Sequence, residues 1–270
     1  MKRTPGPIRI AYDTTGSGTA VVLIMGFSGP GRAWDAQIDL LSKQHQVIWF
    51  DNRGVGSSDA PRRLYSMRRM AADVANLLDH LGVEQAHVVG VSMGGMISQE
   101  FALQYRHRVR SLCLIATHHG GPRSWFAKPQ GLKLFLQTHT SPPRSRYEAL
   151  ERLLYTDEYL RSNDPDEVRE TLKLNFGNPA PSWSRFAQAV AVLRHNTAPR
   201  LHQLSGVPTL VVKPVEDILI RPSHSDRLAQ LIPGARLVPI AGGHGLVREC
   251  ADELSALLLE HFAVADQNEG

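Results

Sequence analysis

The chain has 270 residues, of which 42% are hydrophobic, enough to bury a large core in one domain with an insertion or in two smaller domains. Its net charge of +4 comes from basic and acidic residues spread along the chain, so we expect no nucleic-acid-binding surface. The chain has two cysteines, an N-terminus without an apolar signal core and no apolar run near the roughly 20 residues of a membrane span, so we expect a cytoplasmic protein without membrane contacts.

Short apolar runs rich in β-branched residues recur along the chain and are predicted to form strands. They cover residues 8–13, 20–25, 46–51, 86–91, 111–116, 208–213 and 235–240. Most of them are apolar throughout, which is typical of strands covered on both faces of a sheet. The turn-rich stretch TTGSGT joins the first two runs, so we expect these two strands to pair antiparallel.

Helical patterns separate several of these strands. Ser66 is a good N-cap for an apolar stripe at helical spacing that ends at Gly82, and further helices are predicted over 93–105 and 250–262. Strands that alternate with helices predict an α/β protein. We expect a twisted, mostly parallel sheet of seven or eight strands with helices on both faces.

Residues 121–199 break this alternation, because they contain no convincing strand pattern. Helical stretches are expected near 129–138, 146–161, 165–176 and 182–196. We interpret residues 1–120 and 200–270 as the core domain and residues 121–199 as a helical cap that lies over the sheet. The alternative is that these helices flank the sheet in the usual way.

Residues 90–94, Gly-Val-Ser-Met-Gly, lie between a predicted strand and a predicted helix. Glycine is needed at Gly90 and Gly94 because side chains there would collide with neighbouring backbone in a sharp strand-to-helix turn. Ser92 would then stand at the tip of the turn, beside the N-terminus of a helix whose backbone donors stabilise negative charge. We therefore predict that Ser92 is a catalytic nucleophile.

A serine hydroxyl needs a general base, which is itself held by a carboxylate. Among the 12 histidines, His244 lies in a glycine-rich loop just after the last predicted strand, where it could reach over the carboxyl edge of the sheet. Glu216 and Asp217 both follow the preceding strand and are both candidates for the carboxylate. His118 and His119 follow another strand and could line a pocket, but they lack metal-ligand spacing, so no metal site is predicted.

Three segments carry a resemblance to a known family: LIMGFSGPGRAW, FDNRGVGSSDAP and HVVGVSMGGMISQEFAL. They resemble the α/β-hydrolase fold superfamily, within it the capped serine hydrolases of the esterase, enol-lactonase and haloperoxidase-like group. The resemblance selects Asp217 as the carboxylate, although Pro214 stands where relatives commonly have glycine. It also implies that the N–H groups of Phe27 and Met93 form an oxyanion hole.

The resemblance implies a serine hydrolase that cleaves a small or medium apolar carboxylic ester or lactone through an acyl-enzyme, without a cofactor. A serine at position 92 argues against the branches of this fold that use an aspartate nucleophile. Three alternatives stay open: carbon–carbon bond hydrolysis of a diketone or ring-cleavage product, perhydrolysis, and a low-turnover small-molecule receptor. Residues expected to line the substrate pocket are Ser28, His118, His119, Trp125 and Trp183.

Overall fold

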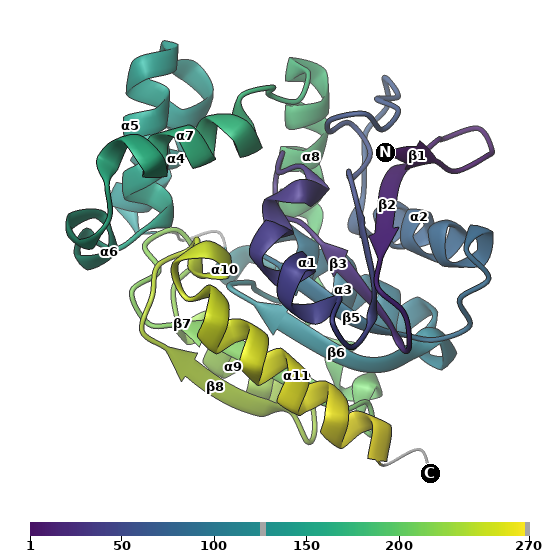
Figure 1. Cartoon of the computed structure of the whole chain (residues 1–270). Coiled ribbons are helices and arrows are strands. Elements are labelled where there is room, and N and C mark those ends of the chain that lie inside the picture. The colour runs from purple at the N-terminus through teal and green to yellow at the C-terminus, as the bar shows by residue number, and fades with distance from the viewer. Residues whose placement is uncertain (125–127, 268–270) are drawn as a thin grey trace.

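The computed structural model describes residues 1–124 and 128–267, and these form an eight-stranded sheet (Figure 1). The strands lie in the order β1-β2-β4-β3-β5-β6-β7-β8. Their bounds are β1 Lys2–Arg3, β2 Ala11–Thr15, β3 Ala20–Ile24, β4 Gln46–Phe50, β5 Ala86–Val91, β6 Val109–Ile115, β7 Thr209–Pro214 and β8 Arg236–Ile240. Among these strands only the pairs β1–β2 and β2–β4 are antiparallel, and all other pairs are parallel. The expected α/β fold with a mostly parallel sheet is therefore confirmed.

The first two expected strands are not neighbours, which corrects the predicted pairing. β2 pairs antiparallel with β4, while β3 lies on the other side of β4 and pairs in parallel with β4 and β5. Every residue of β3 is buried, whereas β2 becomes exposed toward Thr15. A strand that is apolar throughout gains most from a central position, so β3 takes it and β2 is placed nearer the edge.

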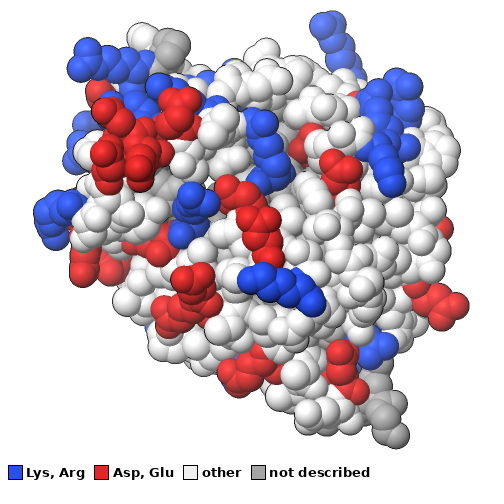
Figure 2. Space-filling view, in the orientation of Figure 1, with Lys and Arg blue, Asp and Glu red and all other residues white. Residues whose placement is uncertain are grey.

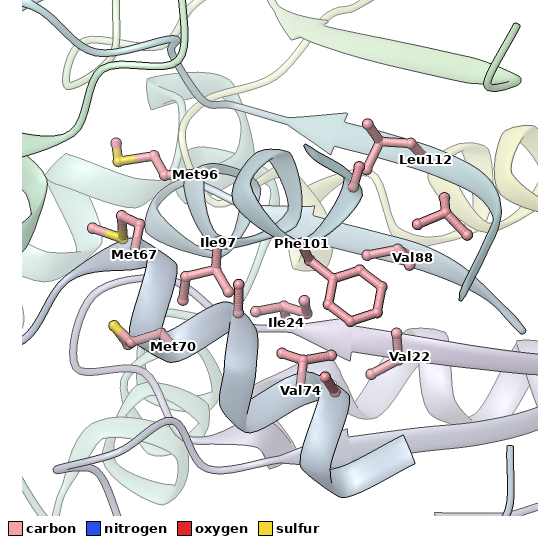
Figure 3. Packing of buried hydrophobic residues seen from close by; sticks show 14 of the residues in the cluster. Val22, Ile24, Met67, Met70, Val74, Val88, Met96, Ile97, Phe101 and Leu112 are labelled. Atoms are coloured by element: carbon pink, nitrogen blue, oxygen red, sulfur yellow. The ribbon is translucent and has the colours of Figure 1, made fainter. Parts of the chain in front are cut away.

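Helices cover both faces of the sheet. On one face lie α1 (Asp35–Leu41), α10 (Leu246–Glu249) and α11 (Ala251–Gln267), which pack on Val21 and Leu23 of β3. On the other face lie α2 (Met67–His80) and α3 (Met93–Gln104), which share one apolar cluster with Val22 and Ile24, and α9 (Ser223–Leu231), which packs on β7 and β8. Figure 3 shows α2 and α3 side chains meeting over these strand residues. Successive residues of β3 thus supply two separate cores, as the alternation of side chains in a strand requires.

The segment between β6 and β7 is helical, as predicted. Its described residues form no strand, although an isolated bridge pairs Gly120 with Asn196. The helices, called the insertion helices below, are α4 (Pro129–Thr140), α5 (Pro143–Leu154), α6 (Asp157–Ser162), α7 (Pro165–Phe176) and α8 (Ser182–Arg194). Figure 1 shows α4 to α7 gathered into one group above α10. Short 3-10 turns cover Gly31–Trp34, Arg106–Arg108, Pro122–Ser124 and Leu201–Leu204.

The insertion helices have small apolar cores of their own. One joins α5 to α7 through Leu150, Val168 and Leu172, and another joins α4 to α5 through Leu134 and Leu153. Two residues of the loop after β7, at positions 218 and 219, pack against the second cluster. Helices α4 to α7 are therefore built around local contacts and rest on a loop of the core, whereas α8 places Ala187 and Ala191 in the main core cluster.

The charged side chains are mixed over the face of the molecule shown in Figure 2. Basic and acidic groups lie close together there, including over the insertion helices at the upper left. None of the helices formed by residues 1–124 and 128–267 is both long enough and apolar enough to cross a membrane.

Candidate active site

Ser92 lies at the turn between β5 and α3 in a conformation that side chains rarely adopt. Its φ of 54° and ψ of −121° are strained for a residue other than glycine, and its N–H donates to the Ile115 carbonyl at 2.9 Å. Gly90 and Gly94 permit the turn. A Cβ at Gly94 would overlap the Ile24 carbonyl oxygen, and one at Gly90 would overlap the Ser98 hydroxyl and approach the Gly94 carbonyl. The predicted need for glycine at both positions agrees with these contacts.

Asp217 follows the end of β7 and is completely buried. Its Oδ1 atom accepts hydrogen bonds from the backbone N–H groups of Leu219 at 2.7 Å and Ile220 at 2.8 Å. Two backbone donors therefore fix the plane of this carboxylate, and its Oδ2 atom is left to face His244. Glu216, the neighbouring candidate, is exposed.

Pro214 ends β7 without breaking the sheet. β7 pairs with β6 only as far as Val212, and toward β8 the ladder is continued by the Val215 N–H, which donates to the Ile240 carbonyl at 3.0 Å. Since successive residues of a strand point their amides to opposite sides, the absent Pro214 N–H belongs on the β6 side, beyond the end of β6. Proline in place of the usual glycine thus removes no hydrogen bond between the strands.

His244 lies in the loop between β8 and α10 and connects the two other candidates. Its Nδ1 atom is 2.7 Å from Asp217 Oδ2, and its Nε2 atom is 3.1 Å from Ser92 Oγ. The imidazole is buried, with 7% of the residue exposed. The three side chains come from three loops at the carboxyl edge of the sheet and form one hydrogen-bonded chain.

Glu249 on α10 holds the loop of His244 against the insertion helices. One carboxylate oxygen accepts from the Gly243 N–H at 2.8 Å, and the other accepts from the N–H and the hydroxyl of Thr156, between α5 and α6. The Gly245 N–H also donates to the Leu154 carbonyl at 2.7 Å. The residues on both sides of His244 are therefore anchored to the same turn of the insertion.

The loop after β3 lies directly beside Ser92. A Cβ at Gly26 would lie 3.7 Å from Ser92 Oγ. Asn52 donates to the Met25 carbonyl at 2.9 Å, and Gln188 of α8 accepts from the Ser28 N–H at 2.9 Å. These contacts fix the loop from both ends, while the described residues offer no acceptor for the N–H of Phe27.

Asp51 and Arg53 hold neighbouring backbone, which agrees with a structural role for both. Asp51 accepts from the N–H groups of Gly31 and Ser57, each at 2.9 Å. Arg53 makes two hydrogen bonds of 2.6 Å to Asp73, and both partners are nearly buried. Burial raises the pKa of Asp73 against the opposing effect of Arg53.

A cavity of about 160 Å³ opens onto Ser92 and His244. Its floor is formed by the loop of Met25–Gly29 and its far wall by insertion helices α4, α5, α7 and α8. Most of the wall is apolar, and the Phe27 ring meets the Phe135 ring edge-on with centroids 5.4 Å apart. Ser28 lines this cavity as expected, and its hydroxyl is buried without a hydrogen-bond partner.

Other expected pocket residues lie elsewhere, and their predicted placement is corrected. His118 and His119 are not among the lining residues; they lie beside His195 and His224 in a separate histidine cluster. The backbone of this segment is tied to the end of α8, since Gly120 forms a bridge with Asn196 and the Thr197 N–H donates to the His119 carbonyl at 2.9 Å. Trp183 packs on Phe186 at the surface and is 38% exposed, and Trp125 lies outside the described residues.

Burial disfavours the charged form in the histidine cluster, and it lowers the pKa of all four imidazoles. Burial lowers the pKa of His118 and of His195 to about 3, and neither ring nitrogen of His195 has a hydrogen-bond partner. Within the part of the chain that the structure describes, no group of three or more His, Cys, Asp or Glu side chains could hold a metal ion.

Sequence reasoning missed several residues of this region. Arg146, Arg185 and His139 line the cavity, and Glu249 and Gln188 hold the loops around it. None of them stands in a recognisable motif, because the insertion carries no short pattern that relates it to the core. Only the position of Glu249, five residues after His244, hinted at a role in that loop.

Comparisons with known proteins identify the family of this chain. A model of the alpha/beta hydrolase fold matches residues 19–248. A protein of Azorhizobium caulinodans with the provisional name carbamate hydrolase is 31% identical over 268 residues, which is 97% of this chain and 98% of that protein.

Two solved structures are also similar over nearly their whole length. A thermophilic esterase from Thermogutta terrifontis has a TM-score of 0.82 at 26% identity, covering 98% of this chain and 99% of that chain. A meta-cleavage product hydrolase from Pseudomonas fluorescens has a TM-score of 0.83 at 26% identity, covering 98% of each chain. The names of these relatives support a hydrolase activity. This chain belongs to the alpha/beta hydrolase fold family.

Proposed function

We propose that the protein is a serine hydrolase that cleaves a small or medium carboxylic ester or lactone with an apolar body. The observation that carries this proposal is the hydrogen-bonded chain from Asp217 through His244 to Ser92, at the floor of a mostly apolar cavity. An engineered cavity of about 150 Å³ accommodates benzene, so a volume of about 160 Å³ suits a small acyl or alcohol group.

In the proposed reaction, Ser92 Oγ attacks the substrate carbonyl while His244 Nε2 takes its proton. Asp217 accepts a hydrogen bond from the Nδ1–H group of His244, so it holds the ring in the tautomer that leaves Nε2 free to act as a base. The protonated imidazole then gives its proton to the departing alcohol. Water, activated by the same imidazole, hydrolyses the acyl-enzyme and regenerates Ser92.

The oxyanion of the tetrahedral intermediate would be stabilised by the N–H groups of Phe27 and Met93. Support comes from the position of the loop of Phe27 beside Ser92 and from the place of Met93 at the first position of α3. Residues 121–199 would act as a cap that excludes water, a role supported by the lining residues that α4, α5, α7 and α8 contribute.

A second candidate function is the hydrolysis of a carbon–carbon bond in a ring-cleavage product. The similarity to the meta-cleavage product hydrolase from Pseudomonas fluorescens favours it, and that chemistry would use the same three side chains. A dienoic diketone offered beside p-nitrophenyl esters separates the two reactions by the product that forms.

Labelling with a fluorophosphonate tests the nucleophile. We expect wild-type protein to be labelled on Ser92 and to hydrolyse p-nitrophenyl butyrate, and Ser92→Ala to do neither while melting at the wild-type temperature. Ser57→Ala is the matched control, because residue 57 is exposed and is not among the residues that line the cavity. Unlabelled wild-type protein, or equal labelling of Ser92→Ala, would refute the assignment.

A further inference from the structure

Two arginines of the insertion face the catalytic cavity without a carboxylate partner. Arg146 on α5 and Arg185 on α8 both line it, and neither forms an ion pair with any described residue. The other charged lining residues, Arg248 and Asp35, lie 3.2 Å apart and pair with each other. The unneutralised charge in this cavity is therefore positive and belongs to Arg146 and Arg185.

Both guanidinium groups keep donors unused. Arg146 donates from Nη2 to the Phe176 carbonyl at 2.7 Å, and Arg185 makes one long bond of 3.4 Å from Nη1 to the His139 carbonyl. The Nε atom of each is buried and has no acceptor. A buried charged donor without an acceptor is costly, and a planar guanidinium with free N–H groups matches a carboxylate.

The two arginines act on the same point of the cavity. Arg185 bonds the His139 carbonyl, and the pKa of His139 is lowered chiefly by burial and further by the charges of Arg185 and Arg146, while the bond to the Phe135 carbonyl opposes the shift. His139 is a lining residue at the end of α4, so helices α4, α5 and α8 converge there. Apolar side chains line much of the cavity, and the Phe135 ring contacts both His139, with ring centroids 4.7 Å apart, and Phe27, with centroids 5.4 Å apart.

We propose that Arg146 and Arg185 bind a carboxylate of the substrate, so that the protein cleaves anionic esters or lactones. This inference rests on the proposed hydrolase function and names its substrate class. The reacting carbonyl lies at Ser92, an apolar segment occupies the middle of the cavity, and the carboxylate lies between the two guanidinium groups. The carboxylate supplies the acceptors that the buried Nε atoms lack.

Two sets of esters test the proposal, because the carboxylate could belong to the acyl or to the alcohol part. The first contains p-nitrophenyl monoesters of succinic, glutaric and adipic acid, each with a neutral alkanoate of similar length. The second contains acetylated hydroxybenzoates with their neutral amides. In at least one set we expect kcat/KM to favour the anionic ester by about 30-fold through KM, the order of magnitude of one charged hydrogen-bonded pair.

The variant Arg146→Gln should bring this preference close to one, whereas Arg144→Gln should leave it unchanged. Arg144 is a matched control on the same helix, with 94% of its side chain exposed. Arg146→Lys keeps the charge and loses the planar donors, so an intermediate preference is expected. If Arg146→Gln fails to fold, Arg185→Gln gives the same test from α8.

Binding to the Ser92→Ala variant provides a readout that needs no turnover. Calorimetry should detect tighter binding of the preferred anionic ester than of its neutral partner, and the added Arg146→Gln change should abolish the difference. Equal rates and equal binding for anionic and neutral esters would overturn the proposal while the hydrolase function stands. An equal loss in Arg144→Gln would also overturn it. Absence of labelling and of all ester hydrolysis would instead refute the proposed function.

Discussion

Replacing Asp217 by asparagine should remove nearly all turnover while the fold survives. Asp217 Oδ1 accepts from the N–H groups of Leu219 and Ile220, so the amide oxygen of an asparagine would take that place. The opposite orientation would put the NH2 group against two N–H donors. The NH2 group therefore faces His244 Nδ1, where the wild-type protein has an acceptor.

An imidazole that accepts a hydrogen bond at Nδ1 carries its proton on Nε2. That nitrogen lies 3.1 Å from Ser92 Oγ and would then donate to the hydroxyl, so it could not take the serine proton. In serine proteases, the wrong histidine tautomer lowers kcat by about four orders of magnitude, which corresponds to about 5.5 kcal/mol of transition-state stabilisation. The free energy of unfolding should fall by only about 1–2 kcal/mol, because the backbone hydrogen bonds survive.

Steady-state hydrolysis of p-nitrophenyl butyrate and urea unfolding measure the two effects. Glu216→Gln is the matched control, because it makes the same chemical change at the adjacent exposed residue and should keep kcat within about twofold of wild type. A loss below about tenfold in Asp217→Asn, or a larger loss in Glu216→Gln, would refute the assignment of the acid.

Two further predictions concern positioning and acid stability. Glu249→Gln replaces one of the two accepting carboxylate oxygens by a donor, so it breaks the link between Gly243 and Thr156. We expect kcat to fall about tenfold and the melting temperature to fall by about 2–4 °C. The control Glu253→Gln, at an exposed residue, should keep both the wild-type kcat and the wild-type melting temperature. An unaltered kcat in Glu249→Gln would show that this clamp does not position His244. Burial lowers the pKa of His195 from 6.5 to about 3, so between these pH values the imidazole is protonated in the unfolded chain but not in the folded protein. The free energy of unfolding therefore decreases as the pH falls from 6.5 toward 3. His195→Leu should lose stability less steeply between pH 7 and 5, by up to about 1.4 kcal/mol per pH unit in urea unfolding, and an unchanged slope would contradict the reasoning.

The sequence predicts the core of this protein well because the relevant signals are local. The spacing of apolar residues that identifies a strand or a helix is contained within that one element. Gly90 and Gly94 likewise indicate a turn that only glycine permits. The position of Asp217 after β7 and of His244 after β8 follows from the rule that loops at the carboxyl edge of parallel strands meet. The pairing of β2 with β4 depended instead on competition for burial between distant strands.

The wall of the cavity was not predictable in the same way. His118 follows a strand and looked like a pocket residue, yet its ring lies beside His195, with centroids 6.5 Å apart, and does not line the cavity. Arg146 and Arg185 are separated by 39 positions in the sequence, and only the folding of α5 and α8 around one cavity brings both to its wall. Such convergence depends on helix packing, which no short sequence pattern specifies.

The insertion touches the core at the two loops that carry Asp217 and His244. A Cβ at Gly131 of α4 would overlap the carbonyl oxygen of Ile218, the residue after Asp217, while Leu154 accepts from Gly245, the residue after His244. The insertion therefore cannot simply be replaced by the corresponding segment of a relative. A chimaera that receives a foreign insertion keeps its reacting groups but loses the scaffolding that orients them. A functional chimaera should receive the loops at 215–220 and 241–249 together with the insertion helices that contact them.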